Sequence, residues 1–388
     1  MSIVRAPVSP NILVWGRERL SFSAETVANL IGIPIEKYQE WEKGTALPTT
    51  AQAEKFAKAV KIPFAWLFLD VPPKNPKLPQ NTDYRTLRNQ PLGEISIKLR
   101  YLIDEAVMRR DVMIELYTEQ EIEFPHFREF IDISAYDDIY IAEKLRQILG
   151  LTIDNQIKFK DSGEAFNYYR DYLSTIGFLV FQTGDLSTEE IRGMSIYDDI
   201  FPIIVVNRKD EYNARIFSLI HELVHIVTRT PGICDNFTML SYNEIEQKCN
   251  KIAAEVLVPV KNLILDSNWN LINEYSCNEI CIKKLAKKFT VSREVIIGRL
   301  LTTGKINRDL YIKKLSEYTK EYEIIKEKSK KSGFMPPTAD ICSQVGKLYA
   351  RTVLNAYNQE IITARDASLF LSKLRIHHFS KVEDWCFS

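Results

Sequence analysis

The pattern that most constrains this chain is the histidine pair in His221-Glu222-Leu223-Val224-His225. Residues four apart on a helix lie about 6 Å from each other at Cβ, so both imidazoles can reach one metal ion. Glu222 falls on the adjoining face, where it can take a proton from zinc-activated water. Apolar neighbours predict a buried helix over 214–228, in which unpartnered histidines would be costly. The segment therefore predicts a catalytic site with one Zn²⁺ per chain, zinc being preferred from ligand type.

A catalytic zinc site needs three protein ligands and one open position, so a third ligand must come from elsewhere in the chain. One known arrangement would place Gly at 228 and His at 231, and Thr228 and Pro231 exclude it here. A second helix, expected over 243–257, offers Glu246 as the ligand. Asn250 follows on the same face and could accept the second N–H of a ligating histidine.

Several other residues compete for metal binding or resemble metal ligands. Glu244 lies on a different helix face from Glu246, and Asp235 lies in an expected loop. The remaining histidines are interpreted as structural or surface residues: His126, His377 and His378. Cys277 and Cys281 have helical spacing but no further ligand nearby, so they are interpreted as core thiols.

Composition restricts the classes of protein that remain. Lys and Arg number 51 and Asp and Glu 51, so the chain has no net charge with which to coat nucleic acid. No apolar run approaches the roughly 20 residues of a membrane helix, and the first residues do not resemble a signal peptide. Six cysteines without a Cys-x-x-Cys pair are typical of reduced thiols. We therefore expect a cytoplasmic protein without membrane contact.

Apolar periodicity predicts an α+β chain that is mostly helical. Strands are expected over 177–182 and 201–206, with helices elsewhere in the central region. The expected regions are 1–72, an all-α helix-turn-helix domain; 73–120, a linker and long helix; 121–265, a zincin-like peptidase domain with a small sheet and the histidine-bearing helix; 266–308, a second helix-turn-helix-like segment; and 309–388, a helical C-terminal region.

Residues from about 192 to 259 resemble the ImmA/IrrE zinc peptidases. The matching segments are Arg192 to Ser195, Pro202 to Asn207, Arg215 to His225 and Glu246 to Pro259. Val224, Cys249 and Ile252 stand where the family usually has Gly, Ala and Phe. The resemblance implies that His221, His225 and Glu246 bind zinc and that Glu222 is the catalytic base. It also implies an endopeptidase that cleaves repressor or antitoxin-like proteins in a bacterial or phage stress-response or regulatory system.

Residues 11–70 are similar to the Cro/repressor-type (XRE) helix-turn-helix, through Trp41 to Gly44 followed by Pro48-Thr49. Such domains in the family are followed by a segment like Asp83 to Thr86. Nucleic-acid contacts would come from Lys37, Gln39 and Lys43. However, residues 11–70 carry as many acidic as basic side chains, so DNA binding and protein docking both stay open.

The alternative function is a transcription regulator or antitoxin-type binder in which the zinc domain is a sensor or scaffold. If the chain is a peptidase, we expect an extended protein substrate lying along a strand edge such as 201–206. Whether the chain forms a homodimer stays open.

Overall fold

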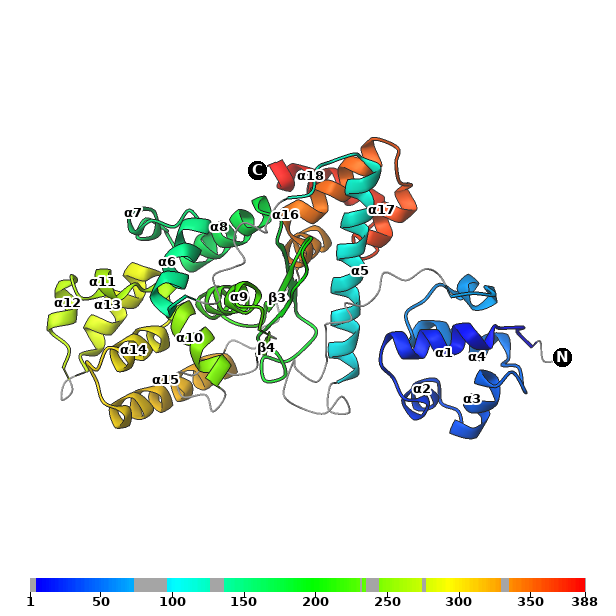
Figure 1. The fold of residues 1–388 in the computed structure, drawn as a ribbon, viewed down its shortest axis with the longest axis horizontal. Coiled ribbons are helices and arrows are strands. Elements are labelled where there is room, and N and C mark those ends of the chain that lie inside the picture. Colours follow the sequence, from blue (N-terminus) through cyan, green and yellow to red (C-terminus); the bar gives the residue numbers. More distant parts are fainter. Residues whose placement is uncertain are drawn as a thin grey trace. The chain divides into compact units, whose positions relative to one another are not determined.

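The computed structural model describes residues 5–72, 96–125, 136–230, 232–234, 244–273, 277–328 and 335–387. It divides into two compact units, which are described separately (Figure 1). Unit 1 contains Met1–Asn81 and Gly93–Val107, and unit 2 contains Thr82–Leu92 and Met108–Ser388.

Unit 1 is built from short helices around an aromatic core. The helices are α1 (Pro10–Arg19), α2 (Ala24–Ile31), α3 (Ile35–Glu42), α4 (Thr50–Ala59) and the 3-10 helix η1 (Phe64–Phe68). The Ser23 hydroxyl accepts from the amide of Thr26 and caps α2. Gly32 ends α2 with φ 72°, a left-handed conformation that glycine adopts without steric cost. Tyr38 and Trp41 are fully buried.

The long helix α5 (Ile97–Glu119) contributes its residues up to Val107 to unit 1 and the rest to unit 2. In unit 1, its Leu99 side chain is buried and the Tyr101 hydroxyl donates to the Ala59 carbonyl over 2.5 Å. Residues 73–95 of the predicted linker and long helix, which include the Asp83 to Thr86 segment, lie outside the described residues.

Unit 2 contains a four-stranded sheet in the order β1-β3-β2-β4. β1 (Leu179–Thr183) and β3 (Ile203–Asn207) are parallel, and these are the two strands that the sequence predicted. β2 (Gly193–Ile196) runs antiparallel to β3, and β4 (Gly232–Cys234) runs antiparallel to β2. Neither β2 nor β4 was predicted, because four and three residues are too few to show a pattern.

The central helix of unit 2 is α9 (Tyr212–Val227), in which every residue from Ile216 to Val227 is buried. It packs against β2 and β3 on one side and against α8 (Ser162–Thr175) and α10 (Glu244–Leu257) on others (Figure 1). α6 (Asp138–Ile148) in turn packs on α10. The helices predicted over 214–228 and 243–257 are therefore confirmed, and α9 is enclosed enough to hold polar side chains away from water.

The remaining helices of unit 2 follow the sheet region. They are α7 (Ile153–Gln156), α11 (Val260–Leu263), α12 (Ser267–Asn270), α13 (Glu279–Phe289), α14 (Arg293–Thr302), α15 (Arg308–Lys328), α16 (Pro337–Asn358), α17 (Ala364–Phe370), the 3-10 helix η4 (Ile376–His378) and α18 (Phe379–Phe387). The fold is thus mostly helical with a small sheet, consistent with the α+β class. None of the described helices combines the length and apolarity needed to cross a bilayer.

Helix α16 lies along the outer edge of β1. The Gln182 side-chain amide on β1 donates to the Ser343 carbonyl over 2.8 Å, and buried Arg170 donates to the carbonyls of Val180 and Gln344. The carbonyls of Ser343 and Gln344 lie in the turn before Gly346, where α16 is kinked and φ is 78°. The predicted regions 266–308 and 309–388 fall in the same compact unit as the sheet.

Candidate metal centre

Helices α9 and α10 bring three potential metal ligands to one point. The Nε2 atoms of His221 and His225 lie 2.9 Å apart. The Glu246 carboxylate, in the first turn of α10, lies 3.2 Å from the first nitrogen and 3.4 Å from the second. One ligand atom from each of the three residues falls within 4.8 Å of the others. The four-residue spacing on α9 explains why the two rings meet, as the sequence predicted.

The chemistry of this donor set fits a zinc ion. Two imidazole nitrogens and a carboxylate are common ligands of catalytic zinc, and both histidines are fully buried. Burial lowers the pKa of His221 to about 4, so this ring is neutral at pH 7, as a metal ligand must be. Burial alone would raise the pKa of Glu246, but its hydrogen bonds with His221 and His225 outweigh burial and lower that pKa. The carboxylate is therefore ionised.

The ring nitrogens that face away from this point also have partners. The Nδ1 atom of His225 lies 2.9 Å from the Thr230 hydroxyl, so it can donate its proton there when Nε2 binds a metal. Asn250 is fully buried, and its interaction with His221 opposes the lowering of the His221 pKa by burial. Asn250 is buried on the helix that carries Glu246, and its role as acceptor for a ligating histidine stays a prediction. Thr230 was missed, because it follows the end of α9 and belongs to no helical pattern.

Glu222 points from α9 toward β2 and is fully buried. Its Oε2 atom accepts a hydrogen bond of 2.8 Å from the Ser195 hydroxyl. The backbone of Gly193 lies so close that a Cβ atom there would be 2.9 Å from Glu222 Oε1. The sequence marked Gly193 and Ser195 only as part of a resembling segment. Their contact with Glu222 depends on the unpredicted strand β2.

Among the described residues of unit 2, the other candidates considered in the sequence do not belong to this cluster. Glu244 is exposed, and Asp235 and His126 fall outside the described residues. His377 is exposed in η4, and Cys281 is a buried free thiol. Ile245, next to Glu246 in the first turn of α10, is 43% exposed, although its apolar side chain would be expected in the core. In unit 1, Gln39 and Lys43 are exposed, whereas Lys37 is half-buried.

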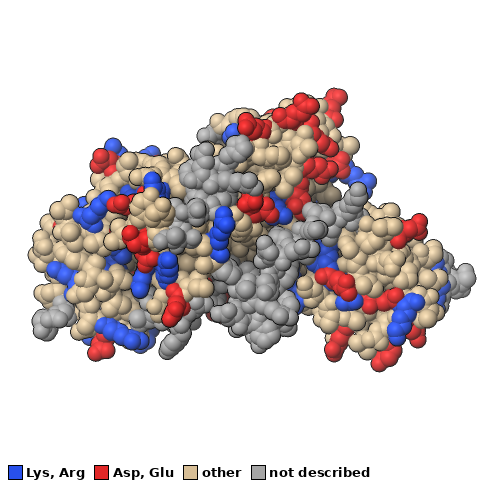
Figure 2. All heavy atoms as spheres, in the orientation of Figure 1, with Lys and Arg blue, Asp and Glu red and all other residues tan. Residues whose placement is uncertain are grey.

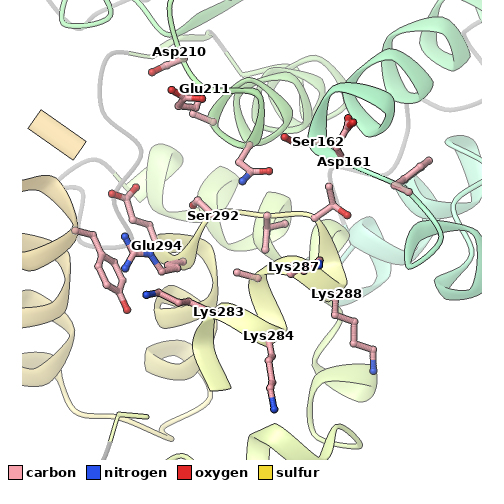
Figure 3. Close-up of a pocket in the computed structure, with 18 of the residues that line it drawn as sticks. Asp161, Ser162, Asp210, Glu211, Lys283, Lys284, Lys287, Lys288, Ser292 and Glu294 are labelled. Carbon is pink, nitrogen blue, oxygen red and sulfur yellow. The ribbon is translucent and has the colours of Figure 1, made fainter. Parts of the chain in front are cut away.

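A pocket of about 830 Å³ lies elsewhere in unit 2, between α13, the α13–α14 turn, α15 and the starts of α8 and α9. None of the candidate ligands lines it. Figure 3 shows Asp210 and Glu211 on one side of this pocket and the α13 lysines on the other, with Lys284 and Lys288 directed away. Because charges of both signs line the pocket, it indicates no particular ligand class.

A buried helix with two histidines, a carboxylate from a second helix and an adjacent glutamate together define a metallopeptidase-type site. Residues 179–301 match the model of a peptidase family described as the IrrE N-terminal-like domain. The matched segment runs from β1 to α14 and includes the whole His-His-Glu cluster. This match supports the ImmA/IrrE resemblance and a peptidase type of activity for unit 2. No curated protein and no solved structure matches the chain.

Proposed function

We propose that the chain is a zinc-dependent endopeptidase that cleaves a regulatory partner protein, of the repressor or antitoxin kind. The observation that carries this proposal is the convergence of His221, His225 and Glu246 with Glu222 alongside. The family match over residues 179–301 supports the peptidase class. The choice of a repressor or antitoxin-like substrate comes from the family resemblance.

The residues of the centre have distinct roles in this proposal. When bound, a zinc ion would supply Lewis-acid polarisation of the peptide carbonyl and acidify water. His221, His225 and Glu246 hold the ion, while Asn250 and Thr230 fix the two imidazole rings. Glu222 accepts a proton from the attacking water and delivers it to the leaving amine. Its complete burial in the protein keeps bulk water from competing for that proton.

The expected substrate position along residues 201–206 is wrong. β3 occupies this segment and is paired on both sides, with β1 and with β2. The outer edge of β1 is covered by α16. Among the described strands, β4 pairs only with β2 and leaves its other edge without a strand partner. We propose that an extended substrate segment pairs with this edge of β4.

Metal content and turnover test the proposed function. The purified chain should hold about one zinc, and His221→Ala should hold none. The metal-loaded chain should cleave peptides in a proteome-derived library, and Glu222→Gln should keep its metal but lose cleavage. Full cleavage by Glu222→Gln would refute the role of Glu222 as the base. Absence of metal from the parent chain would refute the proposed zinc site.

We further propose that unit 1 is a helix-turn-helix module, because Gly32 turns α2 directly into α3. Its exposed α3 residues include Glu36 and Glu40 beside Gln39, and acidic groups there would repel phosphate. Acidic and basic side chains are interspersed over the part of unit 1 seen in Figure 2. This charge pattern favours a protein partner over DNA.

The helix-turn-helix geometry of unit 1 is also compatible with the alternative function, which is a transcription regulator whose zinc domain acts as a sensor. Tight, salt-dependent binding to promoter DNA that Glu222→Gln leaves unchanged would establish that alternative. Cleavage of a partner protein without any DNA affinity would exclude it. A homodimer and a cytoplasmic location remain predictions.

A further inference from the structure

We infer that Ser195 and Gly193, two residues apart on β2, are positioning residues that hold Glu222 in the orientation needed for proton transfer. The inference rests on the proposed function and adds a role for a strand that supplies no metal ligand. Side chains at positions two apart on a strand point to the same face of the sheet. Here that face is the one covered by α9.

The contact with Ser195 fixes one oxygen of the carboxylate. The serine hydroxyl donates to Glu222 Oε2 over 2.8 Å, and Ser195 is 6% exposed while Glu222 is fully buried. A hydrogen bond to an ionised group is stronger than one between neutral groups, particularly where water is excluded. Because Ser195 already donates to Oε2, we assign proton transfer to Oε1.

Gly193 provides the space in which the carboxylate lies. A Cβ atom at this position would be 2.9 Å from Glu222 Oε1, 3.0 Å from Cγ and 3.3 Å from Cδ. The first distance is shorter than real Cβ contacts, so any side chain here would push the carboxylate away. Gly193 therefore sets the position of Oε1, as Ser195 sets the position of Oε2.

The strand is held so that neither residue can easily move aside. β2 pairs with β3 through Gly193–Val206 and Ser195–Ile204, and with β4 through Gly193–Cys234 and Ser195–Gly232. Both backbone edges of β2 are thus hydrogen-bonded. Since α9 is also buried from Ile216 to Val227, the orientation of Glu222 is fixed from both sides.

The experiment separates positioning from a merely structural role by using a small metal-directed ligand. Acetohydroxamic acid chelates the metal of such sites and shares its hydroxyl proton with the neighbouring glutamate. Its affinity for the cobalt(II)-substituted chain can be measured from the visible absorption of cobalt. The variants are Ser195→Ala, Ser195→Thr and Gly193→Ala. The matched control is Ser218→Ala, a buried serine of α9 whose hydroxyl donates to the Ala214 carbonyl.

We expect all variants to keep one cobalt ion, which shows that the centre is intact. Ser195→Ala and Gly193→Ala should weaken acetohydroxamate binding by about tenfold or more, the scale seen when residues that orient a metal site are removed. Ser195→Thr should restore binding, because it keeps the hydroxyl, and Ser218→Ala should have no effect.

Unchanged affinity in Ser195→Ala and Gly193→Ala would overturn the inference, as would equal losses in Ser195→Ala and Ser218→Ala. The proposed function fails separately. A parent chain that binds acetohydroxamate in a Ser195-dependent way but cleaves no library peptide would support the positioning role and refute the peptidase. A parent chain that takes up no cobalt would overturn both.

Discussion

Thr230→Val should weaken zinc binding without removing a ligand. The substitution keeps the size of the side chain but removes the hydroxyl that lies 2.9 Å from His225 Nδ1. The ring then loses the partner that fixes its orientation and its protonated nitrogen. Removing such an outer partner typically costs about 10- to 100-fold in metal affinity, or roughly 1.4–2.8 kcal/mol. The Thr228 hydroxyl, 2.9 Å from that of Thr230, also loses a neighbour.

The assay is competition for zinc against a chromogenic chelator at fixed pH. Thr303→Val serves as the control, because this half-buried hydroxyl donates to the main-chain carbonyls of Arg299 and Leu300 and is not among the residues that contact the candidate ligands. Both variants should unfold cooperatively, but only Thr230→Val should lose affinity. Equal zinc affinity in Thr230→Val and the parent chain would refute the reasoning that Thr230 orients His225.

Three further predictions follow from the structure. Glu246→Gln should lose bound metal, whereas the control Glu244→Gln, at an exposed position two residues earlier, should retain it. Metal analysis of both proteins tests this assignment, and retention of metal by Glu246→Gln would contradict it. Burial would lower the pKa of His225, but hydrogen bonds with Cys249 and Glu246 outweigh it and raise that pKa, so the metal-free ring is protonated near neutral pH. Zinc binding should therefore release about one proton, and zinc affinity should rise with pH. Calorimetry in buffers of different ionisation enthalpy measures the number of protons released, and a value of zero would contradict the prediction. Gly346→Ala should destabilise unit 2 by about 1–3 kcal/mol, since φ is 78° and the new Cβ would lie 3.1 Å from Arg170; an unchanged urea midpoint would contradict this.

The candidate metal ligands could be proposed from the sequence because the spacing within each helix follows from helical geometry, although the meeting of Glu246 with the two histidines depends on the packing of α10 against α9. His221 and His225 are one turn apart, and Glu246 shares a helix face with Asn250, so periodicity places each pair whatever the tertiary structure. The buried run of α9 was equally visible as continuous apolar sequence.

The partners of these residues could not be predicted, because they depend on strand register and chain reversal. Ser195 reaches Glu222 only through the pairing of a four-residue strand between two others. Thr230 reaches His225 because the chain turns after α9 and returns toward it. The expectation that residues 201–206 form a free edge failed for a related reason, since sequence does not give the order of strands in a sheet.

The cover that α16 places on β1 has a consequence for any study that shortens this chain. A chain ending before Pro337 would lack the segment that accepts hydrogen bonds from Gln182 and Arg170. The apolar strand β1 would then present an uncovered backbone edge, which is a template for pairing with another chain. We therefore expect truncation to cause aggregation even where the candidate metal ligands and Glu222 are all present. If deletion of the C-terminal helices abolishes activity, the first explanation to test is therefore loss of soluble protein, and not loss of a catalytic group.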